Sequence, residues 1–156
     1  MIPLVSIREA NANDADDLLR VINDAFIVEQ FFAQGPRLSA AELDDYWTRG
    51  TFFVAESGEQ FAGCVFVDAS PPTGYFGLLS VERTLQRQGL GGRLVAAAED
   101  CCRAAGCTAI KIRVVNLRSE LPPFYRSRDY EETGVEAFES SNTSVPCHFI
   151  AMSKRL

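Results

Sequence analysis

Residues 78–95 have the sequence LLSVERTLQRQGLGGRLV, in which a strand-like segment runs into a glycine turn and then into a helical pattern. The turn holds Gly89, Gly91 and Gly92, and glycine lets a ligand approach the backbone closely. Apolar residues then recur at helical spacing until Gly106 ends the pattern. The first N–H groups of a helix are unpaired, and its dipole adds about half a positive charge, so this turn can hold a diphosphate.

Glycine spacing by itself is also typical of a plain strand-to-helix turn that packs tightly against a sheet. Two other anion-binding loops are excluded by their own residues. A Walker loop requires Gly-Lys followed by Ser or Thr, which this stretch lacks. A dinucleotide-binding fingerprint requires a third glycine at the position of Leu94. The residues around the turn therefore have to decide between a binding loop and a structural turn.

Strand-like and helical segments alternate along the rest of the chain. Runs of aromatic and β-branched residues predict strands over residues 4–8, 52–56, 61–68, 74–81, 108–115, 130–138 and 148–153. Helices are predicted from a cap at Asn13 to Phe26, after a capping box at Ser39, after the glycine turn, and over residues 124–128. The strand, helix and strand around the turn predict a parallel crossover, whereas residues 57–59 join an antiparallel hairpin.

Composition is that of an ordinary globular protein. The 156 residues fit one domain, 1–156, with 47% hydrophobic and 23% charged residues. The net charge of -6 repels phosphate backbones and anionic lipid, so we expect neither nucleic acid nor a membrane as a partner. Five cysteines without a Cys-x-x-Cys pair predict neither a disulfide framework nor a metal site. Since no signal peptide or membrane-spanning segment is recognisable, the expected location is cytoplasmic.

The segment from Gln86 to Gly91 resembles the motif Q/R-x-x-G-x-G/A of the GNAT acetyltransferase superfamily, and the preceding Leu79-Ser80-Val81 also fits. The resemblance implies an α/β fold, a single-domain GNAT-like fold with helices on both faces of a mixed, mostly antiparallel, twisted sheet of about six or seven strands. The central parallel strands would be splayed around the cofactor, acetyl-CoA (coenzyme A).

In that family, the strand before the loop pairs through its backbone with the pantetheine arm, and the loop amides bind the pyrophosphate. The resemblance is detailed over residues 74–135. It implies that the residues in contact with acetyl-CoA are Leu79, Ser80, Val81, Gln86, Arg87, Gln88, Gly89, Leu90, Gly91, Gly92, Arg93, Asn116 and Tyr125.

The similarity continues beyond the helix. Asn116 follows the next strand, and residues 124–130 are similar to the aromatic-Tyr, spacer, Gly-Phe/Tyr block of the family. Tyr125 takes the family's tyrosine position, which implies that it is the general acid that protonates the departing CoA thiolate. Asp129 stands where glycine is usual. That position commonly needs a left-handed backbone, which Asp tolerates better than most residues.

No motif defines the group that takes the proton from the amine. Some relatives carry a carboxylate at the positions that correspond to Tyr75 and Lys111, and neither residue is an acid. Glu29, Asp68 and the only histidine, His148, remain as candidates, and a water relay to such a group is an equal alternative. The expected catalytic residues are Tyr125, Asn116, His148 and Glu29.

The sequence leaves the acceptor open, because this family builds its acceptor pocket from variable parts, here residues 26–38 and 136–148. Aromatic residues in and beside these parts predict a pocket formed by Phe31, Phe32, Tyr75 and His148. The predicted function is transfer of an acetyl group from acetyl-CoA to a primary amine of a small molecule or peptide, by direct attack in a ternary complex. The protein is expected to be a monomer or a homodimer. The alternative is a non-catalytic acyl-CoA sensor or interaction module on the same fold.

Overall fold

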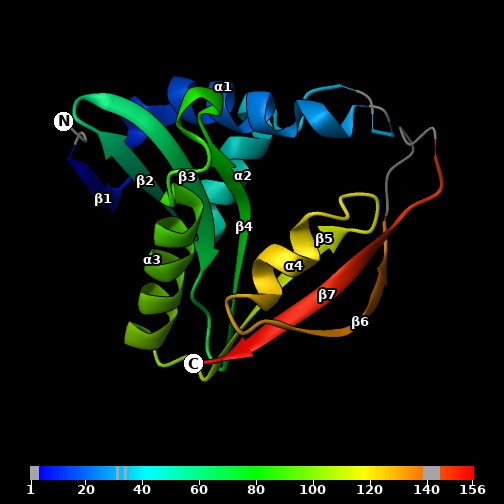
Figure 1. Cartoon of the computed structure of the whole chain (residues 1–156). Helices are drawn as coiled ribbons and strands as arrows, with labels where there is room; N and C mark the ends of the chain where they lie inside the picture. Colours follow the sequence, from blue (N-terminus) through cyan, green and yellow to red (C-terminus); the bar gives the residue numbers. More distant parts are fainter. Residues whose placement is uncertain (1–3, 31, 34, 139–144) are drawn as a thin grey trace.

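A computed structural model describes residues 4–30, 32–33, 35–138 and 145–156. The strands in these residues form one seven-stranded sheet in the order β1-β2-β3-β4-β5-β7-β6 (Figure 1). They are β1 (Val5–Glu9), β2 (Thr51–Ser57), β3 (Gln60–Asp68), β4 (Thr73–Val81), β5 (Ala109–Val115), β6 (Glu131–Ala137) and β7 (His148–Arg155). Neighbouring strands are antiparallel except β4 and β5, which are parallel. The predicted crossover and the predicted hairpin of β2 and β3 are confirmed.

Helices cover both faces of this sheet. They are α1 (Ala15–Ala25), α2 (Ala40–Arg49), α3 (Leu90–Ala104) and α4 (Leu121–Arg126), with short 3-10 turns η1 (Ala12–Asp14), η2 (Phe26–Glu29) and η3 (Arg83–Leu85). The apolar side chains of α1 and α2 form one core with β2 and β3, and those of α3 and α4 form a second core on the other face. Within the described residues, none of the helices combines the length and the apolar character needed to span a bilayer.

The entry to α1 differs from the prediction, which placed the helix cap at Asn13. The side-chain cap belongs to η1, which leads directly into α1. Asn11 accepts a hydrogen bond from the Asn13 N–H at 2.9 Å, and Asp14 Oδ2 accepts from the Asn11 N–H at 2.8 Å, whereas Asp14, the N-cap of α1 itself, makes no side-chain cap bond. Two asparagines with the same capping ability stand two residues apart, so the sequence pattern alone did not separate them. The predicted capping box at Ser39 is confirmed, with Glu42 as its partner.

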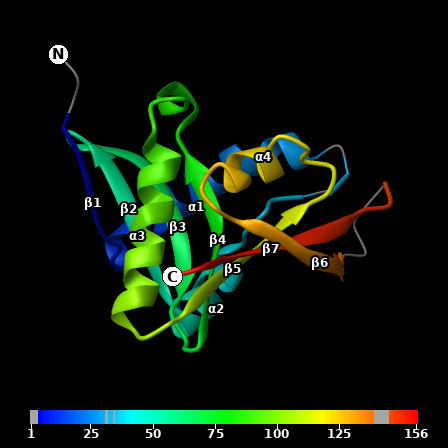
Figure 2. The ribbon, with the colours of Figure 1, turned by 60° about the horizontal axis from the view of Figure 1, so that its bottom comes forward.

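A bulge in β4 changes the course of its second half. The register with β3 shifts between Cys64 and Phe66, where β4 contributes one extra residue. Leu78 lies in this bulge with a φ of 56°, a left-handed conformation that is strained for a residue with a Cβ atom. β4 pairs with β5 only over Thr73–Tyr75, and beyond that point the two strands diverge (Figure 2). The sheet therefore opens between its two central strands, as the family resemblance implied.

The fourth helix begins earlier in the chain than the predicted range, 124–128. α4 begins at Leu121, because Pro122 and Pro123 fit its first turn, where the missing proline N–H leaves no helical bond unmade. The helix is followed by Asp129, whose φ of 73° confirms the expected left-handed backbone. Both prolines thus lie inside the helix instead of before it.

A buried polar contact fixes the segment after α4 against the rest of the molecule. The Tyr130 hydroxyl donates to Glu99 Oε2 at 2.8 Å, and Lys154 Nζ lies 3.1 Å from the same oxygen. Because Glu99 belongs to α3 and Lys154 to β7, this contact joins elements on the two sides of the opening. The ring of Tyr130 also packs edge-on against Tyr125, with the ring centres 5.7 Å apart.

Candidate active site

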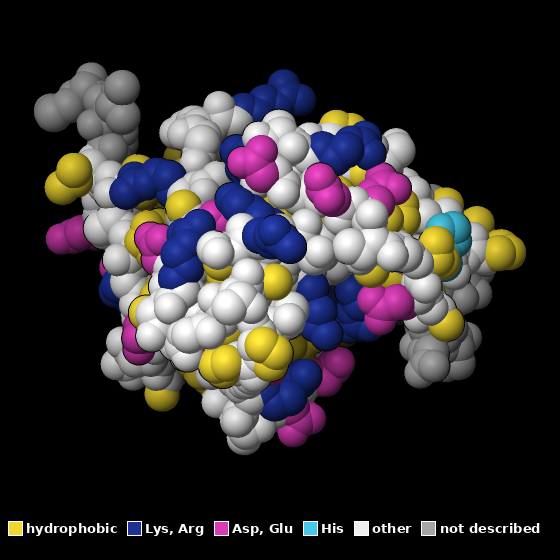
Figure 3. Space-filling view, turned by 90° about the horizontal axis from the view of Figure 1, so that it is seen from below, with side chains coloured by type: hydrophobic (Ala, Val, Ile, Leu, Met, Phe, Trp, Pro, Cys, Tyr) yellow, Lys and Arg dark blue, Asp and Glu magenta, His cyan; other side chains and the backbone are white. Residues whose placement is uncertain are grey.

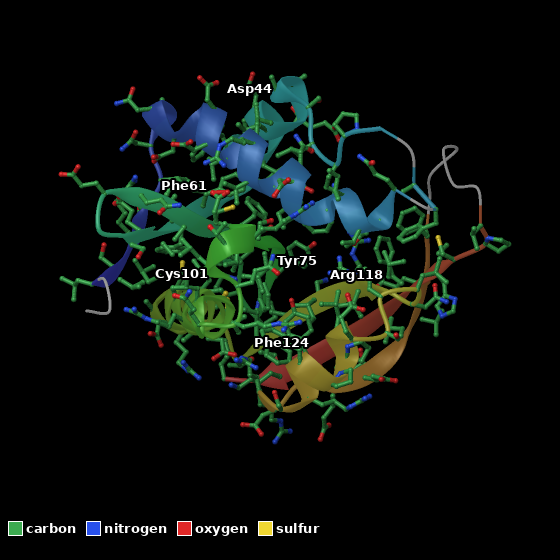
Figure 4. All side chains as sticks on the ribbon, turned by 45° about the horizontal axis from the view of Figure 1, so that its top comes forward. Asp44, Phe61, Tyr75, Cys101, Arg118 and Phe124 are labelled. Carbon is green, nitrogen blue, oxygen red and sulfur yellow. The ribbon has the colours of Figure 1, made fainter. Side chains whose placement is uncertain are left out.

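A cleft of about 1180 Å³ lies where β4 and β5 diverge. Its walls come from the second halves of these two strands, the start of α3, the helix α4, and the residues Phe26, Glu29, Ala33, Gly35, Pro36 and Arg37. Figure 4 shows that Tyr75, Arg118 and Phe124 come from different elements that surround this opening, whereas Cys101 lies away from it on α3. The fold thus brings distant parts of the sequence to one place.

The N-terminus of α3 forms one end of the cleft. Its cap, Gly89, has a φ of 82° and supplies no side chain to the helix amides. The bond from the Arg93 N–H to the Gly89 carbonyl, 3.2 Å long, closes the first turn, so the amides before Arg93 have no partner within the helix. A Cβ atom added to Gly89 would meet nothing within 4 Å, and one added to Gly91 would lie 3.6 Å from Phe124 Cζ. The space above these amides is therefore open.

Basic side chains stand beside this helix end. Arg87 lines the cleft with a φ of 66°, and the Arg128 guanidinium lies 4.0 Å above the ring centre of Phe124. A Cβ atom on Gly92 would lie 2.6 Å from Arg128 Nη2, so a larger residue at this position would displace the guanidinium. The Gln86 side chain donates to the Val81 carbonyl at 3.2 Å and fixes the loop to the end of β4. These charges add to the positive end of the helix dipole.

The backbone of β4 forms the long wall of the cleft. Leu79, Ser80 and Val81 all line it, and β4 has no pairing with β5 in this part. The Ser80 hydroxyl is turned to its own strand, where it donates to the Leu78 carbonyl at 3.0 Å. An extended ligand can therefore form backbone hydrogen bonds along this edge, as an added strand would.

Tyr125 lies in the middle of the cleft. Its side chain projects from α4, is 6% exposed, and packs against Phe76 with ring centres 6.0 Å apart. Its hydroxyl makes no hydrogen bond to any of the described residues, and it is not a fully enclosed polar atom. Burial raises the pKa of this phenol, whereas the charges of Arg118 and Arg128 lower it. The hydroxyl therefore stays protonated and free to act on a ligand.

A partly buried ion pair also lines the cleft. Arg118 Nη1 is 2.8 Å from Glu29 Oε2, and Arg118 Nε is 2.6 Å from Glu120 Oε1. Burial raises the pKa of Glu29, and the hydrogen bond from Arg118 opposes that rise. Glu29 was predicted from the sequence, but Arg118 was not, because no motif includes Arg118 and its partner lies 89 positions away.

The far end of the cleft contains Tyr75. Its hydroxyl lies over Gly77, where an added Cβ atom would be only 2.5 Å away, so glycine is needed for this ring position. Burial raises the pKa of Tyr75, and the charges of Arg113 and Arg37 lower it. Arg113 lies between two rings, 5.9 Å from the centre of Tyr75 and 4.7 Å from that of Phe149. Neither arginine was predicted, since isolated arginines in a strand and a loop give no sequence signal.

Comparison with known proteins decides the family. The model of the Acetyltransferase (GNAT) family matches residues 18–130. The chain belongs to the GNAT family. No curated protein sequence matches it significantly.

Several solved structures share the GNAT fold of this chain. A ribosomal-protein-alanine N-acetyltransferase from Brucella melitensis has a TM-score of 0.80 at 17% identity, over 97% of this chain and 99% of that one. An N-acetyltransferase from Staphylococcus aureus has a TM-score of 0.80 at 13% identity, over 97% and 98%. A GNAT family acetyltransferase from Elizabethkingia anophelis, solved with acetyl-CoA bound, has a TM-score of 0.74 at 17% identity, over 97% and 98%.

Not every residue that the GNAT resemblance indicated lies on the cleft. The cleft is lined by Leu79, Ser80, Val81, Gln86, Arg87, Gly89, Leu90, Gly91 and Tyr125, whereas Gln88, Gly92 and Arg93 are outside this set. Arg93 Nη1 instead donates to the Val5 carbonyl at 3.2 Å.

Asn116 and His148 interact with each other. The Asn116 side-chain oxygen accepts from the His148 N–H at 2.8 Å, and the Asn116 N–H donates to the His148 carbonyl at 2.9 Å. This pair closes the end of the ladder between β5 and β7, and neither residue is part of the described lining. Their catalytic role stays a prediction, and so does that of His148 in the acceptor pocket.

The remaining acceptor and proton-transfer candidates are dispersed. Phe32 is fully buried and contacts Phe138 edge-on at 6.2 Å between ring centres, while Phe31 is outside the described residues. Asp68 accepts from the Ser70 hydroxyl at 2.5 Å, away from the lining. Of the four residues predicted for the acceptor pocket, Tyr75 is the one that lines the described cleft.

Proposed function

We propose that this GNAT chain is an acetyl-CoA-dependent N-acetyltransferase that acts on a primary amine of a small molecule or peptide in a ternary complex. One observation carries the proposal. A single cleft contains the uncapped N-terminus of α3, the unpaired edge of β4 and the free hydroxyl of Tyr125. These are the three groups that an acyl-CoA thioester needs, for its diphosphate, its pantetheine arm and its leaving sulfur.

The residues at the helix end fit a diphosphate. Leu90 and Gly91, whose amides have no partner within the helix, line the cleft together with Arg87 and Arg128, and a Cβ atom on Gly91 would meet only Phe124. Charge-assisted hydrogen bonds to such an anion are about twice as strong as neutral ones. Acetyl-CoA, the cofactor of this enzyme, supplies the activated acetyl group as a thioester. The protein has to hold it, orient the amine and move the protons.

Acetyl transfer forms a bond between the amine nitrogen and the carbonyl carbon and breaks the bond between that carbon and sulfur. An ammonium acceptor first loses one proton to become a nucleophile, its nitrogen loses another as the amide forms, and the departing thiolate gains one. We assign the proton that the thiolate gains to Tyr125. A phenol of ordinary pKa is about 2 kcal/mol too weak an acid for a thiol of ordinary pKa, and burial raises the Tyr125 pKa further. Proton donation is therefore concerted with carbon–sulfur cleavage.

Glu29 is our candidate for the first proton. Of the three glutamates on the described lining, Glu29 alone is buried, and burial raises its pKa, so it is a stronger base than an exposed carboxylate. A lysine-like amine is neutral in only about one part in 2,500 at pH 7, which costs about 4.6 kcal/mol, whereas a peptide α-amine costs about 1 kcal/mol. The contribution of Glu29 therefore depends on the acceptor. A water relay would serve the same purpose.

A non-catalytic acyl-CoA sensor is the alternative function. It would use the same helix end and the same edge of β4, but it would need no proton donor at the thioester sulfur. The free hydroxyl of Tyr125 in the middle of the cleft favours the enzyme. All five cysteines are free thiols, which fits the cytoplasmic location that we propose.

The proposal can be tested with the purified chain in two steps. Calorimetry with coenzyme A measures cofactor binding, and release of free thiol from acetyl-CoA measures turnover with polyamines, amino acids, aminoglycosides and peptides. Mass spectrometry of the product should show one added acetyl group on nitrogen. Binding of coenzyme A without thiol release for any amine would support the sensor instead, and absence of binding would refute both functions.

A further inference from the structure

Arginine is concentrated in the cleft of an otherwise acidic chain. Five arginines and three glutamates line the described cleft, a surplus of two positive charges, whereas the whole chain carries -6. Figure 3 shows Lys and Arg side chains gathered near the middle of one face of the molecule. Arg87 and Arg128 stand at the helix end proposed for the diphosphate. The other three, Arg37, Arg113 and Arg118, stand at the opposite end, where the acceptor has to enter.

These three arginines differ in what they already bind. Arg118 has two carboxylate partners, Glu29 at 2.8 Å and Glu120 at 2.6 Å. Arg37 and Arg113 form no ion pair with any of the described residues. Two guanidinium groups at the acceptor end of the cleft are thus available to an anionic group of a ligand.

Arg113 is held beside two aromatic rings. Its guanidinium lies 4.7 Å from the ring centre of Phe149 and 5.9 Å from that of Tyr75, and its hydrogen bond to Tyr75 contributes to lowering the pKa of that phenol. A guanidinium has five N–H groups that point outward in its own plane, so others remain for a ligand. A carboxylate binds the edge of a guanidinium through two parallel hydrogen bonds, which an arginine held in this way offers with little further loss of side-chain freedom.

Arg37 reaches the same place from another element. It lies in the segment before α2, with its guanidinium 5.3 Å from the ring centre of Phe26. The charges of Arg37 and Arg113 both act on the Tyr75 hydroxyl and lower its pKa. Arg37, Arg113 and Tyr75 all line the same cleft, and the Tyr75 hydroxyl is a further hydrogen-bond donor.

The other glutamates of the lining do not neutralise this pair. The Glu42 carboxylate accepts a hydrogen bond from the Ser39 N–H at 3.0 Å at the start of α2. Glu136 is an exposed residue of the edge strand β6. Neither glutamate forms an ion pair with Arg37 or Arg113, so the acceptor end keeps two cations for a ligand.

We propose that the acceptor is an amine that also carries a carboxylate, and that Arg113 and Arg37 bind this carboxylate beside Tyr75. The inference rests on the proposed acetyltransferase function and specifies its substrate class. The reaction is unchanged: the amine nitrogen takes the acetyl group, its proton leaves, and the thiolate of coenzyme A is protonated, while the carboxylate stays bound and unreacted. A free amino acid and a peptide with an acidic residue both offer this chemistry.

The first experiment compares acceptors that differ only in the carboxylate. Each amino acid is tested beside its methyl ester and its amide, and acidic peptides are tested beside their Asn and Gln counterparts. We expect kcat/KM to be about 10- to 100-fold higher with the carboxylate, the size of a charge-assisted hydrogen bond. The ester and the amide have less basic amines, so their larger neutral fraction at pH 7 works against this preference. The two series separate free amino acids from peptides as the source.

The second experiment uses the variants Arg113→Gln and Arg37→Gln, with Arg103→Gln as control. Arg103 is an exposed residue of α3 that pairs with Asp100 and is not part of the lining. We expect either cleft variant to raise KM for carboxylate acceptors by about 10-fold or more and to leave the ester unchanged. The control should keep the full preference. Calorimetry with coenzyme A should give one affinity for all four proteins.

The outcomes separate this inference from the function on which it rests. Coenzyme A binding with equal turnover of acid, ester and amide would overturn the carboxylate acceptor and leave the acetyltransferase standing. A preference that survives in both arginine variants would overturn the assignment to these residues. If no amine is acetylated, titration of the acids and esters into the coenzyme A complex decides, and equal affinities would overturn the inference.

Discussion

Replacement of Tyr125 by Phe removes one oxygen from the middle of the cleft. We expect this variant to fold like the parent, because the hydroxyl makes no hydrogen bond to the described residues and its loss strands no buried partner. The ring contacts with Phe76 and Tyr130 remain. The free energy of unfolding should therefore change by less than about 0.5 kcal/mol.

The catalytic effect of the same change should be much larger. One positioned acid contributes about 10²- to 10⁴-fold to a rate, which corresponds to about 2.7 to 5.5 kcal/mol of activation free energy. We expect kcat to fall by that factor in a thiol-release assay with a good acceptor. The affinity for coenzyme A should stay nearly constant, because the diphosphate and the pantetheine arm are bound by other residues.

Tyr130→Phe is the matched control, since it removes the same atom from a neighbouring ring. Its hydroxyl donates to the buried Glu99, so we expect a stability loss of about 1.5 to 3 kcal/mol in urea unfolding with kcat almost unchanged. The two variants should thus have opposite profiles. A Tyr125→Phe enzyme that is folded and fully active would refute the general-acid assignment. Tyr125 would then only pack in the lining of the cleft.

Three further predictions address other parts of the molecule. Gly91→Glu should fold, because its Cβ atom would meet only Phe124 at 3.6 Å. Its carboxylate should occupy the diphosphate site at the start of α3 and abolish coenzyme A binding in calorimetry. The control Gly134→Glu, on the exposed strand β6, should bind coenzyme A normally. Tyr75→Phe should change the ranking of amine acceptors by at least about fivefold in kcat/KM at constant coenzyme A affinity, and an equal loss for all amines would contradict its place in the acceptor pocket. The Arg8 hydrogen bonds lower the pKa of Asp14, so the charged form stabilises the fold above the unfolded-state pKa, and this contribution is lost progressively as the pH falls through the lower folded-state value. Asp14→Asn should cost about 1 to 2 kcal/mol in urea unfolding at pH 7 and less at pH 3, and an equal cost at both values would exclude the charge as the cause.

Local sequence signals were sufficient for the helix end and the crossover. Residues 78–95 combine a strand, a glycine turn and a helix within a short stretch, and each step has a local physical cause. The left-handed Asp129 and the capping box at Ser39 are also local, since each depends on residues a few positions apart. These features could be predicted because the chain specifies them before it folds into a sheet.

The bulge of β4 and the ion pairs of the cleft could not be predicted in this way. Leu78 has no propensity for a positive φ, and its conformation follows from the pairing of β4 with β3 on one side only. The contact between Glu29 and Arg118 joins a turn after α1 to a loop after β5, so neither residue indicates the other in the sequence. Isolated charged residues are usually solvated, and tertiary contacts alone bring Arg37, Arg113 and Arg118 to one cleft.

The arginines of the acceptor end also bear on how the amine loses its proton. A cation close to an ammonium group disfavours the charged form and lowers its pKa, and each unit is worth about 1.36 kcal/mol. If a carboxylate of the acceptor neutralises one guanidinium and Glu29 neutralises another, one of the three positive charges remains uncompensated inside the cleft, because Glu120, the second partner of Arg118, lies outside the lining and is 61% exposed, so that water screens its charge. The bound amine would then be easier to deprotonate than in water, which reduces what the base has to supply. For an acceptor of this class, the residues that select the substrate therefore also help to activate it. Deprotonating a lysine-like amine at pH 7 costs about 4.6 kcal/mol, or about 2,500-fold in rate, and Glu29→Gln should lower the activity by less than this factor.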